Sequence, residues 1–240
     1  MLKLTQLSVI YPDKTRAVDS IDLTIHDGET VALIGANGAG KTSLLLALVG
    51  VVASHGTIEV DELKLEPHTV GEIRKRIGVV FQNPDNQLFM PSIYEDVAFG
   101  LRNYGMAEEE IEGTVDRCLD QLDIMKLKHR SPLKLSGGEK RMAAIAGVLV
   151  MEPSLMLFDE PTAFLDPKAR RNLIQSLQKL KPTKLIATHD LPFVAEVCSR
   201  AILLKDGKIF ADGDPHTMLY DKKLMEECGI EAAVRPMEEN

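Results

Sequence analysis

The feature that most constrains the fold is a glycine-rich loop, Gly35-Ala36-Asn37-Gly38-Ala39-Gly40-Lys41-Thr42, which matches the pattern G-x-x-x-x-G-K-S/T. The loop follows an apolar run, Thr30 to Ile34, so the sequence predicts a strand, a tight turn and then a helix. Glycines permit positive φ angles and let amide N–H groups turn toward phosphate oxygens. The following helix directs the positive end of its dipole at the same anion. We therefore expect an α/β fold that binds a nucleotide at this loop.

Three side chains at the end of the loop have predicted roles. Lys41 would reach the β and γ phosphates, and the hydroxyl of Thr42 would be offered to Mg²⁺. The neighbouring Ser43 would hydrogen-bond a nearer phosphate. The loop thus predicts both a nucleotide and a magnesium ion.

Composition and charge exclude several classes of function. The formal net charge is −8, and no block of lysine and arginine forms an extended phosphate-binding face, so we expect no nucleic-acid partner. No apolar run approaches the length that spans a bilayer, and the N-terminus alternates like a strand instead of starting like a secretory signal, so we expect a cytoplasmic chain. The cysteines have no metal-ligand spacing, which favours buried, reduced thiols at Cys118, Cys198 and Cys228.

The order of strand and helix patterns predicts one domain with a helical insertion. Residues 2–10 and 20–34 alternate apolar and polar positions, which predicts an antiparallel β layer that leads into the loop. Helix formers dominate after residue 83, and strands alternating with helices return after residue 153, which is typical of a parallel α/β sheet. We expect an α/β core (1–82 and 153–213), a helical subdomain (83–152) and a short C-terminal tail (214–240).

Two acids follow the buried strand predicted at Leu155 to Phe158. Ligands of open α/β sheets bind at the carboxyl ends of strands, where Asp159 and Glu160 stand. Asp159 would hold Mg²⁺, through water, and Glu160 would orient or deprotonate the attacking water. An acidic pair is also common as a solvated strand end, and the glycine-rich loop in the same chain favours the chemical role.

A second glycine-containing loop, Leu135-Ser136-Gly137-Gly138-Glu139, precedes a helix inside the helical span. Its hydroxyl and backbone amides, from Ser136, Gly137 and Gly138, would form a second anion site at a helix terminus. Taken alone, however, such a segment is more typical of a loop and a helix N-cap. In this order the motifs resemble those of the ABC ATPases over almost the whole chain, with 135–139 as the signature loop. The resemblance implies the ABC ATPase fold, ATP and Mg²⁺ as cofactors, and hydrolysis of ATP to ADP and phosphate.

The resemblance also implies roles for three residues outside the two loops. Tyr11 stands where the family has an aromatic residue that stacks on adenine. Gln82 matches the glutamine loop and would contact Mg²⁺ or the attacking water. His189 matches the switch histidine and would hold the γ-phosphate and Glu160 in register.

In that family two nucleotide-binding domains pack head to tail, and each ATP lies between the phosphate loop of one chain and the signature loop of the other. Ser136 and Gly138 would then act on the ATP of a partner chain, and Asp166 in the D-loop would bridge the subunits. Two residues depart from the commonest pattern. Glu139 replaces a glutamine, which we expect to be tolerated, and Phe164 places a bulky ring in the D-loop, which leaves the detailed geometry of the dimer interface open.

Three stretches resemble a narrower group, the ATPases of energy-coupling factor transporters and of cobalt and nickel uptake systems: 81–89, 92–100 and 141–147. The resemblance implies a transmembrane coupling protein and a small substrate-binding membrane protein as partners, at the cytoplasmic face of the membrane. Residues 88–91 are candidates for a groove that receives a coupling helix, or else pack inside the helical subdomain.

Several alternatives stay open at this point. The chain would work as a homodimer or with a sister ATPase, and its substrate would be cobalt, nickel, biotin or another vitamin. A conventional ABC importer or exporter would use the same chemistry, although the segment 83–89 argues against it. A soluble ABC protein of translation or DNA repair typically has two ATPase domains, a coiled coil or basic arms, and none is visible here. A binding module without catalysis is disfavoured by Glu160.

Overall fold

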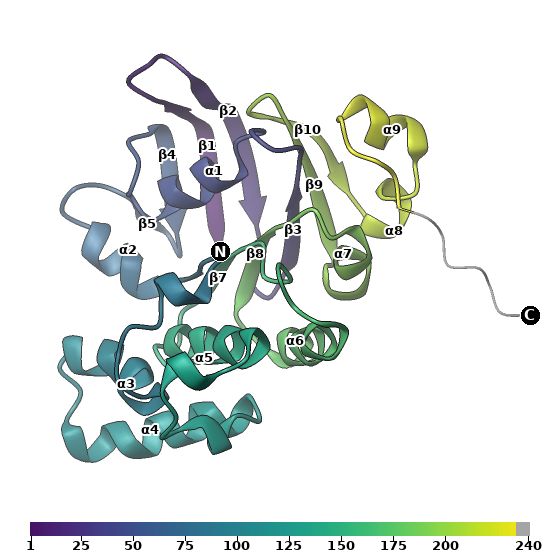
Figure 1. The fold of residues 1–240 in the computed structure, drawn as a ribbon. Coiled ribbons are helices and arrows are strands. Elements are labelled where there is room, and N and C mark those ends of the chain that lie inside the picture. Colours follow the sequence, from purple (N-terminus) through teal and green to yellow (C-terminus); the bar gives the residue numbers. More distant parts are fainter. Residues whose placement is uncertain (234–240) are drawn as a thin grey trace, which may run out of the picture. The chain divides into compact units, whose positions relative to one another are not determined.

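The computed structural model describes residues 1–233, which form two compact units. The first unit consists of Met1–Arg74 together with the chain from Thr183 onward, and the second consists of Lys75–Pro182. Figure 1 shows the helices and strands of both units in colours that follow the sequence. The helical subdomain expected over 83–152 lies inside the second unit, which also contains strands on either side of it.

The first unit contains an antiparallel sheet. Its order is β2-β1-β4-β5, and β1 pairs antiparallel with both β2 and β4. One face is apolar because alternate residues of β1, such as Leu2 and Leu4, are buried. The alternation shifts where Gln6 adopts a φ of 49°, and Leu7 and Val9 continue the buried face. The strands span β1 (Leu2–Ile10), β2 (Arg16–Ile25), β4 (His55–Val60) and β5 (Leu63–Lys64).

The same unit contains four strands of a mixed sheet in the order β10-β9-β3-β8. The central strand β3 (Thr30–Ile34) is buried at every residue and runs parallel to β8 (Thr183–Ala187) and β9 (Arg200–Lys205). A continuous buried run is what a strand covered on both faces requires. The edge strand β10 (Lys208–Gly213) runs antiparallel to β9, and it was not anticipated because its exposed, weakly alternating residues give little strand signal.

The helices of the first unit are short. Helix α1 follows β3 directly, and its N-terminus therefore lies at the carboxyl edge of the mixed sheet. The expected tail contains two short helices instead of one, and its acidic end, Met237 to Asn240, lies outside the described residues. The bounds are α1 (Lys41–Leu48), α2 (Val70–Arg76, whose last two residues belong to the second unit), α7 (Leu191–Val197), α8 (Pro215–Met218) and α9 (Lys222–Glu227).

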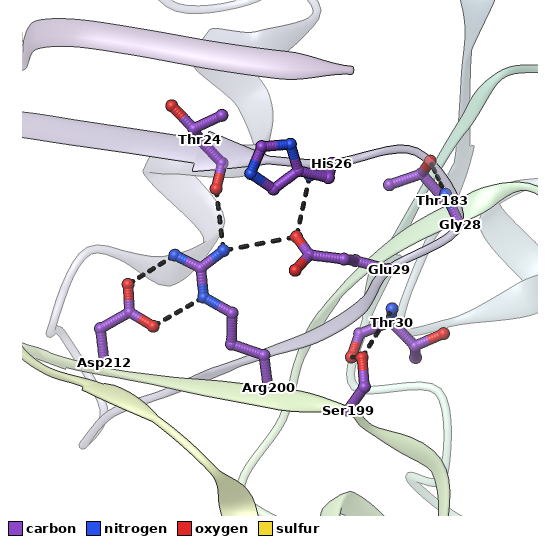
Figure 2. Close-up of polar contacts among 9 residues, drawn as sticks. All are labelled: Thr24, His26, Gly28, Glu29, Thr30, Thr183, Ser199, Arg200 and Asp212. Atoms are coloured by element: carbon purple, nitrogen blue, oxygen red, sulfur yellow. Dashed lines mark hydrogen bonds and ion pairs between the residues drawn. The ribbon is translucent and has the colours of Figure 1, made fainter.

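A network of ion pairs and hydrogen bonds lies at the amino-terminal edge of the mixed sheet, opposite the edge where α1 begins (Figure 2). Arg200, the first residue of β9, forms a bidentate pair with Asp212 of β10, with N–O distances of 2.7 and 2.6 Å. The same guanidinium donates to the carbonyl oxygen of Thr24 at 2.8 Å and lies 3.3 Å from the carboxylate of Glu29. Asp212 raises the pKa of Arg200 further, so the charge is permanent. This network joins the two sheets of the unit at the edge that carries none of the predicted site residues.

The second unit consists of a parallel strand pair and a group of helices (Figure 1). Strand β6 (Ile77–Val80) pairs parallel with β7 (Leu155–Asp159), and both are largely buried. Helices α3, α4 and α5 contact one another through apolar stripes such as Val97 and Leu101 of α3. The helices span α3 (Ile93–Asn103), α4 (Glu108–Gln121), α5 (Gly137–Leu149) and α6 (Pro167–Lys179), with single 3₁₀ turns at Pro84–Asn86, Met125–Leu127 and Pro132–Lys134.

Candidate functional site

The glycine-rich loop connects β3 to α1 as the sequence predicts. Gly40 is the N-cap of α1 and has a φ of 104°, which only glycine adopts readily. A Cβ atom there would lie 2.0 Å from the carbonyl oxygen of Ala17, so both conformation and space require glycine. A Cβ on Gly35 would lie 2.5 Å from the carbonyl oxygen of Leu204. The neighbouring strands therefore fix the path of the loop.

Lys41 is held over this loop. Its side chain is buried, and its ammonium donates to the carbonyl oxygens of Gly35 at 2.6 Å and of Ala36 at 3.3 Å. A buried lysine needs hydrogen-bond partners for its charge, and these two loop carbonyls accept from the ammonium. The ammonium is thus positioned at the loop, where a phosphate oxygen would replace neutral acceptors with an anionic one.

The N-terminus of α1 is unusual among the helices of the described chain. It has no side-chain cap and no acidic residue in its first turn. Six other helices receive a hydrogen-bonding side chain at the N-cap, from Ser92, Ser136, Asp166, Asp190, Asp214 and Asp221. The first turn of α1 therefore presents a positive end without a carboxylate of its own, which is the arrangement that favours an external anion.

Two further predicted residues lie on the same unit as this loop. The hydroxyl of Tyr11 is 3.0 Å from that of Ser43, so the aromatic ring predicted to stack on adenine is tied to the first turn of α1. His189 follows β8, whose end pairs in register with β3 at Leu33 and Ala187. Because neighbouring parallel strands end at the same edge, His189 lies at the edge of the sheet where the loop lies. Its imidazole is exposed.

The acidic pair occupies the end of β7 in the second unit. Asp159 is the last residue of this strand and is only partly buried, after four fully buried apolar residues. Glu160 has a φ of 46°, a conformation that is costly for a residue with a Cβ atom. Strained backbone of this kind is typical of positions where a side chain has to be aimed in a fixed direction.

The second glycine-containing loop starts α5, and its hydrogen bonds form a capping box. The hydroxyl of Ser136 accepts a hydrogen bond from the amide of Glu139 at 3.3 Å, and the Glu139 carboxylate accepts from the amide and hydroxyl of Ser136, each at 3.0 Å. The Ser136 amide, with a weaker effect from its hydroxyl, lowers the pKa of Glu139. A carboxylate of this chain therefore binds two of the donors that we expect to bind phosphate, the amide and the hydroxyl of Ser136.

The structure brings Ser136, Gly138 and Asp166 together. A Cβ on Gly138 would lie 2.5 Å from that of Ala169 in α6, so glycine permits α5 and α6 to approach. Asp166 caps α6 by accepting from the amides of Lys168 at 2.9 Å and Ala169 at 2.8 Å. All three predicted residues line one cavity of about 390 Å³. Three lysines, Lys126, Lys168 and Lys179, also line it.

Gln82 follows β6 in an exposed position. Its backbone is bound by the first residue of the stretch 141–147, for which the sequence predicts no role. Arg141 of α5 donates to the carbonyl oxygens of Phe81 and Gln82 at 2.5 and 2.6 Å. An arginine inside the run Lys140-Arg141 after a helix start normally indicates a solvated face. Nothing in the pattern signals that this one is only 1% exposed.

Two kinds of feature are absent from the described part of the chain. Within residues 1–233, no group of three or more histidine, cysteine or acidic residues is placed to hold a metal ion. None of the helices described is both long and apolar enough to cross a bilayer. All three cysteines are free and buried, as predicted, and burial raises the pKa values of Cys118 and Cys198 to about 12.

Comparison with known proteins places these features in one class. The phosphate loop, the strand-end acids and the capped glycine loop define a P-loop nucleotide-binding protein, and residues 18–163 match the family model described as ABC transporter. The chain is 39% identical over 236 residues to an energy-coupling factor transporter ATP-binding protein EcfA of Methanothermobacter thermautotrophicus, which covers 96% of this chain and 76% of the relative. The chain belongs to the ABC transporter family of ATP-binding proteins.

Solved structures agree with this assignment. CbiO1 from Clostridium perfringens, described as part of the ABC transporter complex cbiONQ, superimposes with a TM-score of 0.85 at 37% identity and covers 94% of this chain and 93% of its own. The ATP-binding cassette MJ0796, a dimer bound to ADP and phosphate after hydrolysis, superimposes with a TM-score of 0.80 at 28% identity, covering 90% and 99% of the two chains. The predicted ABC ATPase fold is confirmed, and the chain is an ATPase that binds ATP.

Proposed function

We propose that this chain powers an uptake transporter for a metal ion or vitamin, of the energy-coupling factor or cobalt/nickel type, by ATP-driven closure of a dimer. The observation that carries the proposal is similarity over nearly the whole chain to an EcfA protein and to CbiO1. ABC ATPases work as dimers with transmembrane partners, so the chain would act at the cytoplasmic face of the membrane.

Binding of ATP follows from the chemistry of the loop in the first unit. The uncapped first turn of α1 and the ammonium of Lys41 supply positive charge for the phosphates. Ser43 would donate to a phosphate oxygen, and Tyr11, which is held beside Ser43, would cover the adenine ring. The γ-phosphate would be contacted by His189 from the same edge of the sheet.

The donor set fits magnesium. Thr42, Asp159 and Gln82 offer a hydroxyl, a carboxylate and an amide oxygen, which are the hard oxygen ligands that Mg²⁺ prefers. Mg²⁺ at nucleotide sites is usually held by one or two protein oxygens together with phosphate oxygens, which is what these residues would offer. When bound, the ion neutralises charge that develops on the phosphates.

Hydrolysis would depend on Glu160 as the general base. Its carboxylate would accept a proton from the water that attacks the γ-phosphate, and the strained backbone at φ 46° would fix its direction. Gln82 would orient the same water, and Asp159 would stay ionised as a ligand. Phosphoryl transfer needs positioning more than covalent chemistry, so each of these residues acts by holding a reactant in place.

The partner surface would be the aromatic pair Phe89 and Phe99. Phe89 is 66% exposed, Phe99 is 40% exposed, and their rings meet edge to face at 5.1 Å. The carboxylate of Asp96 fixes this segment by accepting from the amides of Phe89 and Met90, each at 3.0 Å. Of the four residues predicted to form the groove, Leu88 is instead buried in the second unit. An exposed aromatic pair on a fixed backbone suits an amphipathic coupling helix.

The experiment that tests the proposal is identification of the membrane partners. The tagged chain would be purified from gently solubilised membranes of its native cell, and copurifying proteins identified by mass spectrometry. Recovery of a coupling protein with a small substrate-binding membrane protein is expected and would name the substrate class. A conventional permease pair would assign the chain to another kind of ABC transporter, and soluble partners alone would contradict the transport role.

The catalytic part of the proposal has its own test. Glu160→Gln removes the base and keeps the shape, so kcat should fall at least about 100-fold while ATP binding is retained. The matched control is Glu152→Gln, since Glu152 lies in the same unit with a similar φ of 51°. Steady-state phosphate release checks both variants. Unchanged hydrolysis in Glu160→Gln would remove Glu160 from the role of base.

A further inference from the structure

Arg141 carries a buried charge that has no carboxylate partner among residues 1–233. Its side chain is 1% exposed, although a charged group is seldom buried unless it is paired. Its two terminal nitrogens donate to the carbonyl oxygens of Phe81 and Gln82, and its Nε atom is buried with no hydrogen-bond partner within the described chain. Burial alone lowers the pKa of the guanidinium to about 10. Among the described residues, these two neutral carbonyl oxygens are therefore the only hydrogen-bond partners that compensate the guanidinium for its lost hydration.

The geometry of the fork explains why the residue is an arginine. The planar guanidinium presents parallel N–H groups, and here they span the carbonyls of two successive residues, at 2.5 and 2.6 Å. A lysine at this position would offer one nitrogen and would fix the two carbonyls less rigidly. The pair of hydrogen bonds therefore sets both the position and the direction of the backbone at Gln82.

Other contacts bind the same segment to the same helix. The ammonium of Lys140 lies 2.6 Å from the carboxylate of Asp85, and the side-chain nitrogen Nε2 of Gln87 donates to the carbonyl oxygen of Ala144 at 3.1 Å. The helix α5 thus holds residues 81–87 at three successive points along its first two turns. Arg141 is the central one of these and the only one that reaches Gln82 directly.

We infer that Arg141 is a positioning residue that couples the N-terminus of α5 to Gln82. This inference rests on the proposed function, in which Gln82 orients the attacking water and Ser136 at the start of α5 meets the nucleotide of a partner chain. Any displacement of α5 when its N-terminus binds phosphate is transmitted through the guanidinium to the Gln82 backbone. Hydrolysis at one nucleotide would then depend on occupancy of the site that α5 serves.

The first test measures the anchoring itself. In the full chain, Arg141→Met should raise hydrogen–deuterium exchange of the amides of residues 81–88 about fivefold, because the segment loses the attachment of its first two residues. The substitution removes the desolvation cost of a buried charge and also removes two hydrogen bonds, and because these effects oppose each other the Tm should change little. The control is Arg117→Met, an exposed arginine of α4 in the same unit that should change neither quantity. Unchanged exchange at 81–88 in Arg141→Met would overturn the inference.

The second test asks whether Arg141 acts through Gln82. Arg141→Met should lower kcat about tenfold with KM for ATP within about twofold, and Arg141→Lys should fall between it and the unsubstituted chain. In a Gln82→Ala background the same substitution should cause no further loss, because its target is gone. Losses that multiply in the double variant would overturn the inference. If Gln82→Ala alone keeps full kcat, the Gln82 role in the proposed function fails as well, and the Glu160 variant shows separately whether the hydrolytic site is correct.

Discussion

Helices α1 and α5 both begin at glycine-containing loops, yet they begin in opposite ways. The first turn of α1 follows Gly40, has no side-chain cap and contains no acid. The first turn of α5 is closed by Ser136 and Glu139, which bond reciprocally. The α1 terminus therefore presents its positive end to an external anion, whereas the α5 terminus already has a carboxylate of its own.

This difference separates two kinds of anion site. Phosphate at α1 gains the helix terminus and the Lys41 ammonium at once. Phosphate at α5 has to share the Ser136 donors with Glu139 or displace that carboxylate. We therefore predict that the α1 site binds nucleotide in a single chain, and that the α5 site responds only when a partner presents a phosphate. Two positions make this difference: the N-cap, which is Gly40 in α1 and Ser136 in α5, and the residue three positions later, which is Ser43 in α1 and Glu139 in α5.

The largest expected effect breaks the α1 site. Gly40→Ala would place a Cβ atom 2.0 Å from the carbonyl oxygen of Ala17 at a φ of 104°, so ATP affinity should fall more than about 100-fold. The control is Gly113→Ala in α4, where the nearest atom to a Cβ is the end of the Arg117 side chain at 3.7 Å. Calorimetric titration with ATP measures both variants. Ordinary affinity in Gly40→Ala would contradict the loop geometry.

A smaller effect on dimerisation is expected from a substitution at the N-terminus of α5. Glu139→Gln keeps the capping-box pattern and removes the negative charge beside the proposed phosphate position, so ATP-driven dimerisation should strengthen about threefold to tenfold. Glu109→Gln, an exposed acid at the start of α4, is the control and should leave dimerisation unchanged. Sedimentation velocity over a range of ATP concentrations measures the shift. Weaker dimerisation of Glu139→Gln would show that the carboxylate assists the contact.

The smallest effect is a pH dependence of stability. The pKa of Glu139 is lowered below its ordinary value of 4.5, chiefly by the Ser136 amide. A lowered pKa in the folded state means that the contribution of the carboxylate is fully present above pH 4.5 and is lost as the pH falls through the lowered value. Between pH 6 and pH 3 the Tm should therefore drop slightly more for the unsubstituted chain than for Glu139→Gln. If the Tm of both proteins fell equally as the pH was lowered, the Glu139 carboxylate would not contribute to the capping box.

The sequence predicted the parts of this fold that depend on strong local patterns. The buried run before the phosphate loop, the acids after β7 and the Ser136 loop are each defined by residue type and spacing alone. The pattern Ser136-x-x-Glu139 also contains the signal for the capping box, since a glutamate three residues after a serine N-cap is its signature. Only the structure shows that this capping box occupies donors of the expected anion site.

Other features depend on contacts between distant residues, which no local pattern records. The buried Arg141 is 60 positions from Phe81 in the sequence, and it resembles any other surface charge on a helix. Arg200 reaches Thr24 across 176 positions in the same way (Figure 2). Edge strand β10 was missed because an exposed strand has no apolar alternation to reveal it. The roles of the site residues in catalysis stay predictions.

The most direct test of the account is whether ATP assembles the α1 site of one chain with the α5 site of another. In Glu160→Gln, which should bind ATP without turnover, sedimentation velocity should show monomers without nucleotide and dimers with ATP and Mg²⁺. Adding Ser136→Asp, which keeps an N-cap acceptor and places a second carboxylate at the start of α5, should abolish the dimer while each chain still binds ATP. A chain that binds ATP and stays monomeric without that second substitution, or a dimer that survives it, would contradict the account.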